Sequence, residues 1–257
     1  RGGGEESEGR DFGLTPGAGF LMSVLLFAAK CLVAWCTADT ETAIAAIDLG
    51  FLLYAGPFSF FASLTPLSAL HRFLSEALVG HIFLGELVFN AWALPLIDKG
   101  TTYHMTPDMW VHHVAGTFSG LSCILIGQTF PVFLKLSSQL AVTECTTPLP
   151  VAFRQSIKNK RMRGARSITF ASLMPMAFIW RTAWSAHIWK SCFHVVSRSP
   201  TMPLLAWPAL ISLGSIVCCN AFWTSKIFQG AGKIAKKRLE AAYPNGFPPL
   251  LSAPVPA

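Results

Sequence analysis

The stretch MWVHHVAGTFSGLSCILIG, residues 109–127, contains no charged side chain and is largely apolar apart from two adjacent histidines. Its length is close to the roughly 20 residues with which an α-helix crosses the hydrocarbon core of a bilayer. Inside lipid every backbone N–H and C=O needs a partner within the protein, and a helix supplies these partners from a single segment. The stretch therefore predicts a membrane-spanning helix.

Similar apolar blocks recur along the chain, and none shows the narrow apolar stripe of a helix on a soluble protein. A helix that is apolar all round lies either deep in a core or against lipid. The fold class that we predict is all-α, a polytopic transmembrane helical bundle of six or seven spans. The predicted segments are residues 20–36, 43–63, 75–96, 109–127, 130–153, 167–189 and 204–228.

The composition of the whole chain supports lipid as the solvent. Of its 257 residues, 52% are hydrophobic and 13% are charged, about half the charged fraction of a typical soluble domain. A chain of this length cannot bury so many apolar helices in water. The net charge of +7 lies in clusters between apolar blocks, which is typical of membrane topology and argues against a nucleic-acid partner.

Two basic clusters are expected to lie at the membrane surface on the same, inner side. They contain Arg154, Lys158, Lys160, Arg161, Arg163 and Arg166 in one loop, and Lys233, Lys236, Lys237 and Arg238 in the tail. The first loop, with Asp39, Glu41 and Asp48, has no basic residue and fits the opposite side better. Six spans would place that loop outside and seven would place it inside. The acidic N-terminal arm favours seven, with the N-terminus outside.

Three regions follow from this pattern: a polar, Gly-rich arm over residues 1–19, the transmembrane domain over 20–228, and a basic, then Pro-rich tail over 229–257. The chain begins at Arg1 rather than Met, which indicates a fragment or a removed targeting sequence. An organellar membrane (mitochondrial or plastid) or the endoplasmic reticulum is the expected location. The seven cysteines form no CxxC pair and are expected to be small buried residues.

Polar groups inside apolar spans are costly, so they are the default candidates for a functional site. His112 and His113 are the catalytic candidates, because a neutral imidazole acts as a base or a hydrogen-bonding group near pH 7. An interfacial, simply hydrogen-bonded pair is the bland alternative. We expect neither a metal nor a cofactor. The candidates for lining a lipid cavity are His81, Glu86, Asn90 and Glu144.

Spacing gives some of these candidates expected partners. Glu86 and Asn90 lie four residues apart and share a helix face, whereas His81 and Glu86, five apart, are only loosely aligned. A histidine from segment 109–127 is the expected partner of Glu86. Glu144, in a Thr-rich stretch before Pro148, is expected at a broken helix end. Arg181, with its aromatic neighbours, is expected to extend toward the membrane surface.

Taken in order, these motifs resemble the TLC-domain family, the membrane domain shared by ceramide synthases and translocation-associated membrane proteins. The matching residues are His112-His113-Val-Ala-Gly116, then Glu144-Cys-Thr-Thr147-Pro148, and then Asn220-Ala-Phe-Trp223, which leads to Lys226 and Gly230. Order and spacing agree over roughly Leu74 to Lys237. The resemblance implies a helical barrel with room for a lipid.

The chain departs from this pattern where the family carries catalytic acids. It has Gly80-His81 and Glu86 in place of Gly-Tyr…Asp, and residues 135–143 lack the paired aspartates of ceramide synthases. The resemblance therefore implies a lipid-binding or lipid-homeostasis role without catalysis, outside the ceramide-synthase branch. Two alternatives stay open: an accessory subunit of an organellar respiratory or photosynthetic complex, and an acyl-CoA-dependent acyltransferase. Membrane lipids, and in the first alternative other subunits, are the expected partners.

Overall fold

The computed structural model describes residues 14–37, 40–65, 69–97, 105–150, 152–153 and 165–242. Most of the basic loop, residues 154–164, and the Pro-rich end, residues 243–257, lie outside the described residues, as do residues 1–13. All regular secondary structure in the described part of the chain is helical, which confirms the predicted all-α class.

The first three helices form one group. Helix α1 covers Ala18–Cys36 and α2 covers Thr40–Leu64. A third helix runs without a break over Ala69–Ile97 and is called the α3–α5 helix here. It consists of α3 (Ala69–Ala77), π-helical turns over Leu78–Gly85, α4 (Glu86–Val88), π-helical turns over Phe89–Ala93, and α5 (Leu94–Ile97).

The second group begins with α6, which covers Pro107–Ile126, and α7, which covers Val132–Ala141. A 3₁₀ turn over Val142–Thr146 continues α7. Two long helices follow, α9 over Ala165–Arg198 and α10 over Ala206–Ala242. Pro107 occupies the first turn of α6, where the missing N–H of proline is tolerated.

Five helices in the described residues are long and apolar enough to cross a membrane: Ala18–Cys36, Ala45–Ala62, Ala69–Ile97, Pro107–Ile126 and Ala206–Lys233. Their exposed surfaces carry large apolar side chains, including Leu25 and Trp35 on α1 and Ile211 on α10. A protein in water would not leave such residues exposed in this number, whereas lipid solvates them.

The predicted segments 130–153 and 167–189 differ from the structure. The first was expected to be one spanning helix, but α7 ends at Ala141 and tightens into the 3₁₀ turn ahead of Pro148. The second corresponds to α9, which is longer than predicted and carries Arg181, His187 and Lys190. Neither helix is among the five that meet the length and composition of a span, so the choice between six and seven spans stays a prediction.

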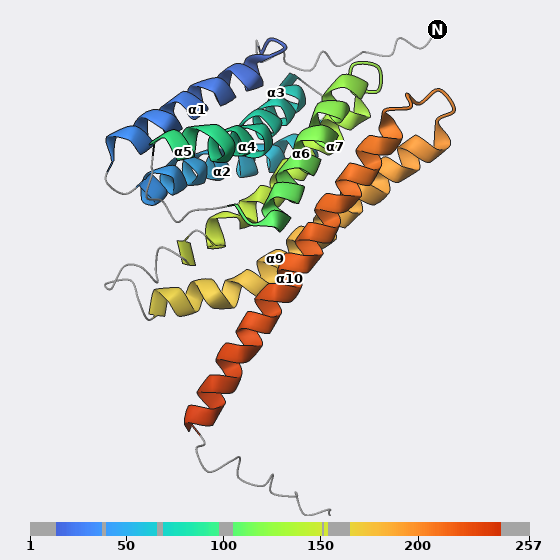
Figure 1. Cartoon of the computed structure of the whole chain (residues 1–257). Helices are drawn as coiled ribbons and strands as arrows, with labels where there is room; N and C mark the ends of the chain where they lie inside the picture. Colours follow the sequence, from blue (N-terminus) through green and yellow to red (C-terminus); the bar gives the residue numbers. More distant parts are fainter. Residues whose placement is uncertain are drawn as a thin grey trace, which may run out of the picture.

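Side-chain contacts fix the direction in which neighbouring helices run. Lys30 of α1 contacts Asp48 of α2 and Glu86 of the α3–α5 helix, whereas Glu76 accepts hydrogen bonds from Gly17 and Gly19 at the start of α1. α1 and the α3–α5 helix are therefore parallel. His71 contacts the Ala62 carbonyl and His81 contacts Asp48, so α2 is antiparallel to both. α9 and α10 form a long antiparallel pair that lies against α6 and α7 (Figure 1).

Two glycines bring α6 close to the α3–α5 helix. A Cβ atom added at Gly116 would overlap the Phe83 ring, and one added at Gly120 would overlap the Val79 side chain. Such close backbone approach is how helices pack in lipid, where dispersion contacts and not water exclusion drive association. The approach places the His112–His113 turn of α6 directly against Phe83.

Candidate functional site

Three groups of polar side chains are buried in the bundle. We call the first the Lys30 cluster: Lys30, Asp48, His81, Glu86 and Asn90. The Lys30 ammonium donates to Asp48 Oδ1 at 3.1 Å and Oδ2 at 3.0 Å, and also to Glu86 Oε1. Asn90 Nδ2 donates to Glu86 Oε2 at 3.1 Å. His81 Nε2 lies 3.3 Å from Asp48 Oδ1 without an aligned hydrogen bond.

The π-helical turns explain how His81 and Glu86 come to serve the same cluster. In an ordinary α-helix, residues five apart are rotated away from one another, and the sequence predicts only loose alignment for this pair. A π-helical turn hydrogen-bonds residue i to i+5, so it brings residues five apart above one another. The turns over Leu78–Gly85 have this effect, and both side chains reach groups bound to Lys30.

Sequence reasoning missed Lys30 and misplaced Asp48. Lys30 is the one charged side chain within the first apolar block, and Asp48 was assigned to a loop although it lies inside α2. The expected partner of Glu86 was also wrong, because Lys30 and Asn90 bind it instead of a histidine of α6. A signal was present: a lone lysine in an apolar span requires a carboxylate partner within the membrane.

The second group, the Arg181 cluster, consists of Arg181, Glu144, Thr146, Thr147 and Asn220. Arg181 donates from Nη2 to Glu144 Oε1 at 2.6 Å and from Nε to Asn220 Oδ1 at 2.9 Å. Its Nη1 contacts the Thr143 carbonyl, Glu144 Oε2 and the hydroxyls of Thr146 and Thr147. The guanidinium is thus fully satisfied by a carboxylate and surrounding oxygens, which is the arrangement that a buried ion pair needs.

The position of Arg181 corrects the expectation that it extends toward the membrane surface. Its side chain is 3% exposed and joins α9 to the 3₁₀ turn and to α10. Its neighbours on α9, His187, Lys190 and His194, are exposed. Glu144 does lie at a broken helix end, as predicted, where the Thr147 hydroxyl donates to it, but this end is buried in the bundle.

The third group is the histidine pair, His112 and His113, on the buried face of α6. The two rings lie 5.4 Å apart and edge to face, and Phe83 contacts both of them. His112 is 3% exposed and His113 is 7% exposed. The Nδ1 atom of each ring is buried and has no hydrogen-bond partner. An unpartnered polar atom in such surroundings costs about 1–3 kcal/mol, so a group that bonded it would be stabilised there.

The histidine pair lies between the other two groups. His113 is close enough to Glu144, Lys30 and Arg181 to interact electrostatically with all three, and His112 interacts with Arg181. The structure therefore brings together the predicted candidates His112, His113 and Glu144. His81, Glu86 and Asn90 belong to the separate Lys30 cluster.

Trp223 and Asp108 border the histidine pair. The Trp223 indole lies 4.9 Å from the His112 ring, and its Nε1–H donates to the carboxylate of Asp108 at the start of α6. Trp223 is only partly buried, and Val111 and Val114 on the adjoining face of α6 are exposed. The histidine pair thus lies one side-chain layer below the outer surface of α6 and α10.

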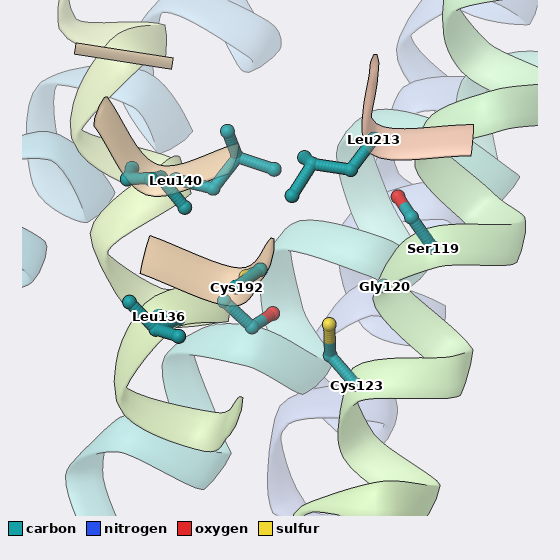
Figure 2. Close-up of a pocket in the computed structure, with 9 residues that line it drawn as sticks. Ser119, Gly120, Cys123, Leu136, Leu140, Cys192 and Leu213 are labelled. Carbon is teal, nitrogen blue, oxygen red and sulfur yellow. The ribbon is translucent and has the colours of Figure 1, made fainter. Parts of the chain in front are cut away.

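A small cavity lies beside α6, away from the histidine pair. Its volume is about 10 Å³, close to the space that one water molecule needs and far below that of an acyl chain. Figure 2 shows Leu136 and Leu140 on one side of it and Leu213, Ser119 and Cys123 on the other. None of the six predicted site residues lines this cavity.

The basic membrane-surface candidates are described only in part. Lys233 and Lys236 are exposed near the end of α10, where that helix extends past the rest of the bundle (Figure 1). The side chains of Arg166, Lys237 and Arg238 lie outside the described part, as do Arg154, Lys158, Lys160, Arg161 and Arg163.

No family model, no curated protein and no solved structure matches this chain. The class of protein therefore rests on the helices themselves. Five of them are long and apolar enough to span a bilayer, and the large apolar side chains on their surfaces are exposed. The chain is an α-helical integral membrane protein.

Proposed function

We propose that this chain is a TLC-type membrane protein that binds a membrane lipid through the His112–His113 pair and has no catalytic activity of its own. The observation that carries the proposal is the pair of buried, unpartnered Nδ1 atoms on α6. A lipid hydroxyl, amide or ester group could hydrogen-bond these atoms, while its acyl chains remained among apolar side chains.

The charges around the pair favour an uncharged polar headgroup. Arg181 and Glu144 neutralise one another, and each nitrogen of the guanidinium already donates a hydrogen bond away from the histidines. A phosphate would therefore meet no free cation beside the imidazoles among the described side chains. An approach for such a lipid from the membrane, between α6 and α10, is supported by the exposed Val111 and Val114 and the partly buried Trp223.

The test compares the lipid retained by purified wild type and by the double variant His112→Phe/His113→Phe. Phenylalanine keeps the aromatic contacts with Phe83 and Trp223 but removes all four ring nitrogens. Removing the unpartnered Nδ1 atoms costs little, whereas the loss of the hydrogen bond between His113 and the Ile82 backbone is checked by comparing thermal unfolding of the variant and wild type. Mass spectrometry of the extracted lipids should show one class retained by wild type and lost from the variant.

The matched control is His187→Phe/His194→Phe, which makes the same two substitutions on the exposed side of α9. It should retain the lipid class that wild type retains. Equal lipid retention by the His112/His113 variant and the control would rule the proposal out. So would purified wild type in which no lipid class is enriched over its proportion in the membrane from which the protein was extracted.

The unpartnered imidazole nitrogens also favour one second candidate, acyl transfer, because a free Nδ1 is a potential general base. Wild type incubated with acyl-CoA and a long-chain base would then form an amide. The lipid-binding proposal expects no more product than His112→Phe gives, and turnover above that control would replace it with the acyltransferase. The accessory-subunit hypothesis stays a prediction, which co-purifying chains would support.

A further inference from the structure

The Lys30 cluster holds two carboxylates against one ammonium, which leaves it one positive charge short. Lys30 and His81 are each 2% exposed, and Glu86 is 8% exposed. An uncompensated charge at this depth in a membrane protein is expensive, so such residues are paired or mark a pathway for an ion or a proton. The Arg181 cluster supplies no compensation, because its own carboxylate neutralises Arg181.

Every carboxylate oxygen in the cluster already faces a donor or a potential donor. Lys30 occupies both oxygens of Asp48 and Oε1 of Glu86, and Asn90 occupies Oε2. A metal ion would have to displace the ammonium. Among the described residues, no group of three or more His, Cys, Asp or Glu side chains is arranged to hold a metal.

His81 is the side chain in the cluster whose position would allow it to supply the missing charge. Its Nε2 is buried, lacks an aligned hydrogen bond, and lies 3.3 Å from Asp48 Oδ1. The ring packs on Phe51 at 4.6 Å, which holds it in this orientation. We propose that the Lys30 cluster is a binding site for one proton, taken from water and held on the His81 imidazole against Asp48.

The proton balance is simple: the imidazole gains one proton and becomes imidazolium, and no other bond forms or breaks. We place the contact with water, through which the proton arrives, at the Asp48 side chain, because it is 20% exposed and lies near the start of the span Ala45–Ala62. The other titratable groups around the cluster are Cys31 beside Lys30 on α1 and His113 on α6, which interacts with Lys30 electrostatically. In their neutral forms, Cys31 and His113 carry no positive charge, so neither balances the second carboxylate of the cluster.

The decisive measurement is the ¹⁵N NMR spectrum of histidine-labelled wild type in nanodiscs at about pH 7.5, where about nine in ten free imidazoles are neutral. We expect an imidazolium signal that disappears in His81→Gln and in Asp48→Asn, because the latter removes the excess negative charge. The matched substitution His187→Gln, on the exposed side of α9, should leave the signal unchanged.

Thermal stability gives a second, independent readout. A proton that the folded cluster holds and the unfolded chain releases stabilises the fold at low pH, and this stabilisation is lost as pH rises. Between about pH 6 and pH 8.5, the melting temperature of wild type should therefore fall by several degrees more than that of His81→Gln.

A wild-type spectrum without any imidazolium signal at about pH 7.5 would overturn the proposal, even if the variants failed to fold. A melting temperature that rises with sodium concentration but not with acidity would also overturn it, because a metal cation would then supply the charge. The proposal does not depend on lipid binding, since His112→Phe/His113→Phe leaves the cluster's own residues in place.

Discussion

Arg181 shows how one side chain joins three separate elements. Its guanidinium binds Glu144 in the 3₁₀ turn and Asn220 on α10, and its Cζ lies 5.9 Å from the Trp223 ring. Trp223 in turn packs on His112. The Arg181 cluster thus sets the position of the histidine pair although it makes no hydrogen bond to it.

We expect Arg181→Leu to destabilise the protein by about 3–5 kcal/mol, because it leaves the Glu144 carboxylate buried without its partner. The double variant Arg181→Leu/Glu144→Leu should recover much of this loss, since it removes both charges. Thermal unfolding in detergent measures the cycle, with Lys190→Leu on the exposed side of α9 as control. A cost for Arg181→Leu no larger than that of Lys190→Leu would contradict the role of the cluster.

The candidate site was only partly predictable at the scale of residues. His112, His113 and Glu144 were found because polar groups stand out in apolar segments, and Glu86 and Asn90 because a four-residue spacing defines a shared face. Arg181 was assigned to the surface because a long cationic side chain near tryptophans usually extends there. Its burial depends on Glu144 and Asn220, which are 37 and 39 residues away. A pairing between residues so far apart cannot be predicted from the sequence around Arg181.

At the scale of elements, the contact between α6 and the α3–α5 helix depends on glycine. Gly116 and Gly120 lie one turn apart and receive Phe83 and Val79 in the space that side chains would otherwise fill. The same contact holds the histidine pair against Phe83. Any widening of this interface would expose both imidazoles.

Gly116→Ala should therefore destabilise the protein by about 1–3 kcal/mol, the usual cost of overpacking a close interface. Gly50→Ala is the matched control, because that position on α2 has no atom within 4 Å of the added methyl group. The control should stabilise α2 by about 0.5–1 kcal/mol, the helix-propensity difference between the two residues. Similar melting temperatures for the two variants would mean that the interface is looser than described.

The spans themselves were largely predictable, and the departures have physical reasons. α1, α2, the α3–α5 helix, α6 and α10 agree with predicted segments to within a few residues at most ends, because hydrophobic length alone defines them. α10 instead continues to Ala242, since its basic end contains no proline before Pro244. The π-helical turns were not predicted; they bring His81 and Glu86 to one cluster with side chains on α1 and α2.

At the scale of the whole molecule, successive helices alternate in direction from α1 to α10. Arg181 binds Glu144 and Asn220, whereas later on α9 Trp184 Nε1 donates to the Gln139 carbonyl and Trp189 Nε1 to the Leu210 carbonyl. α9 is therefore antiparallel both to α7 with its 3₁₀ turn and to α10. If α7 and α9 both cross the bilayer together with the five helices that meet the criteria of a span, the two ends of the chain lie on opposite sides.

An epitope tag at each end tests this arrangement in sealed, right-side-out membrane vesicles. With seven crossings, an impermeant antibody should detect the N-terminal tag, and the C-terminal tag only after permeabilisation, since the basic end of α10 is expected inside. A soluble lumenal protein, undetected before permeabilisation, serves as the control for sealing. Detection of both tags on one side would favour six crossings.

Lys30 has a consequence for how the chain enters its membrane. A lysine near the middle of an isolated helix opposes insertion by about 2.5–3.5 kcal/mol on biological scales, and α1 emerges from the ribosome before either of its carboxylate partners. Only when α2 and α4 follow are both counterions available. We therefore expect α1 to remain with the insertion machinery until these later segments are synthesised, so that the three helices enter the lipid together.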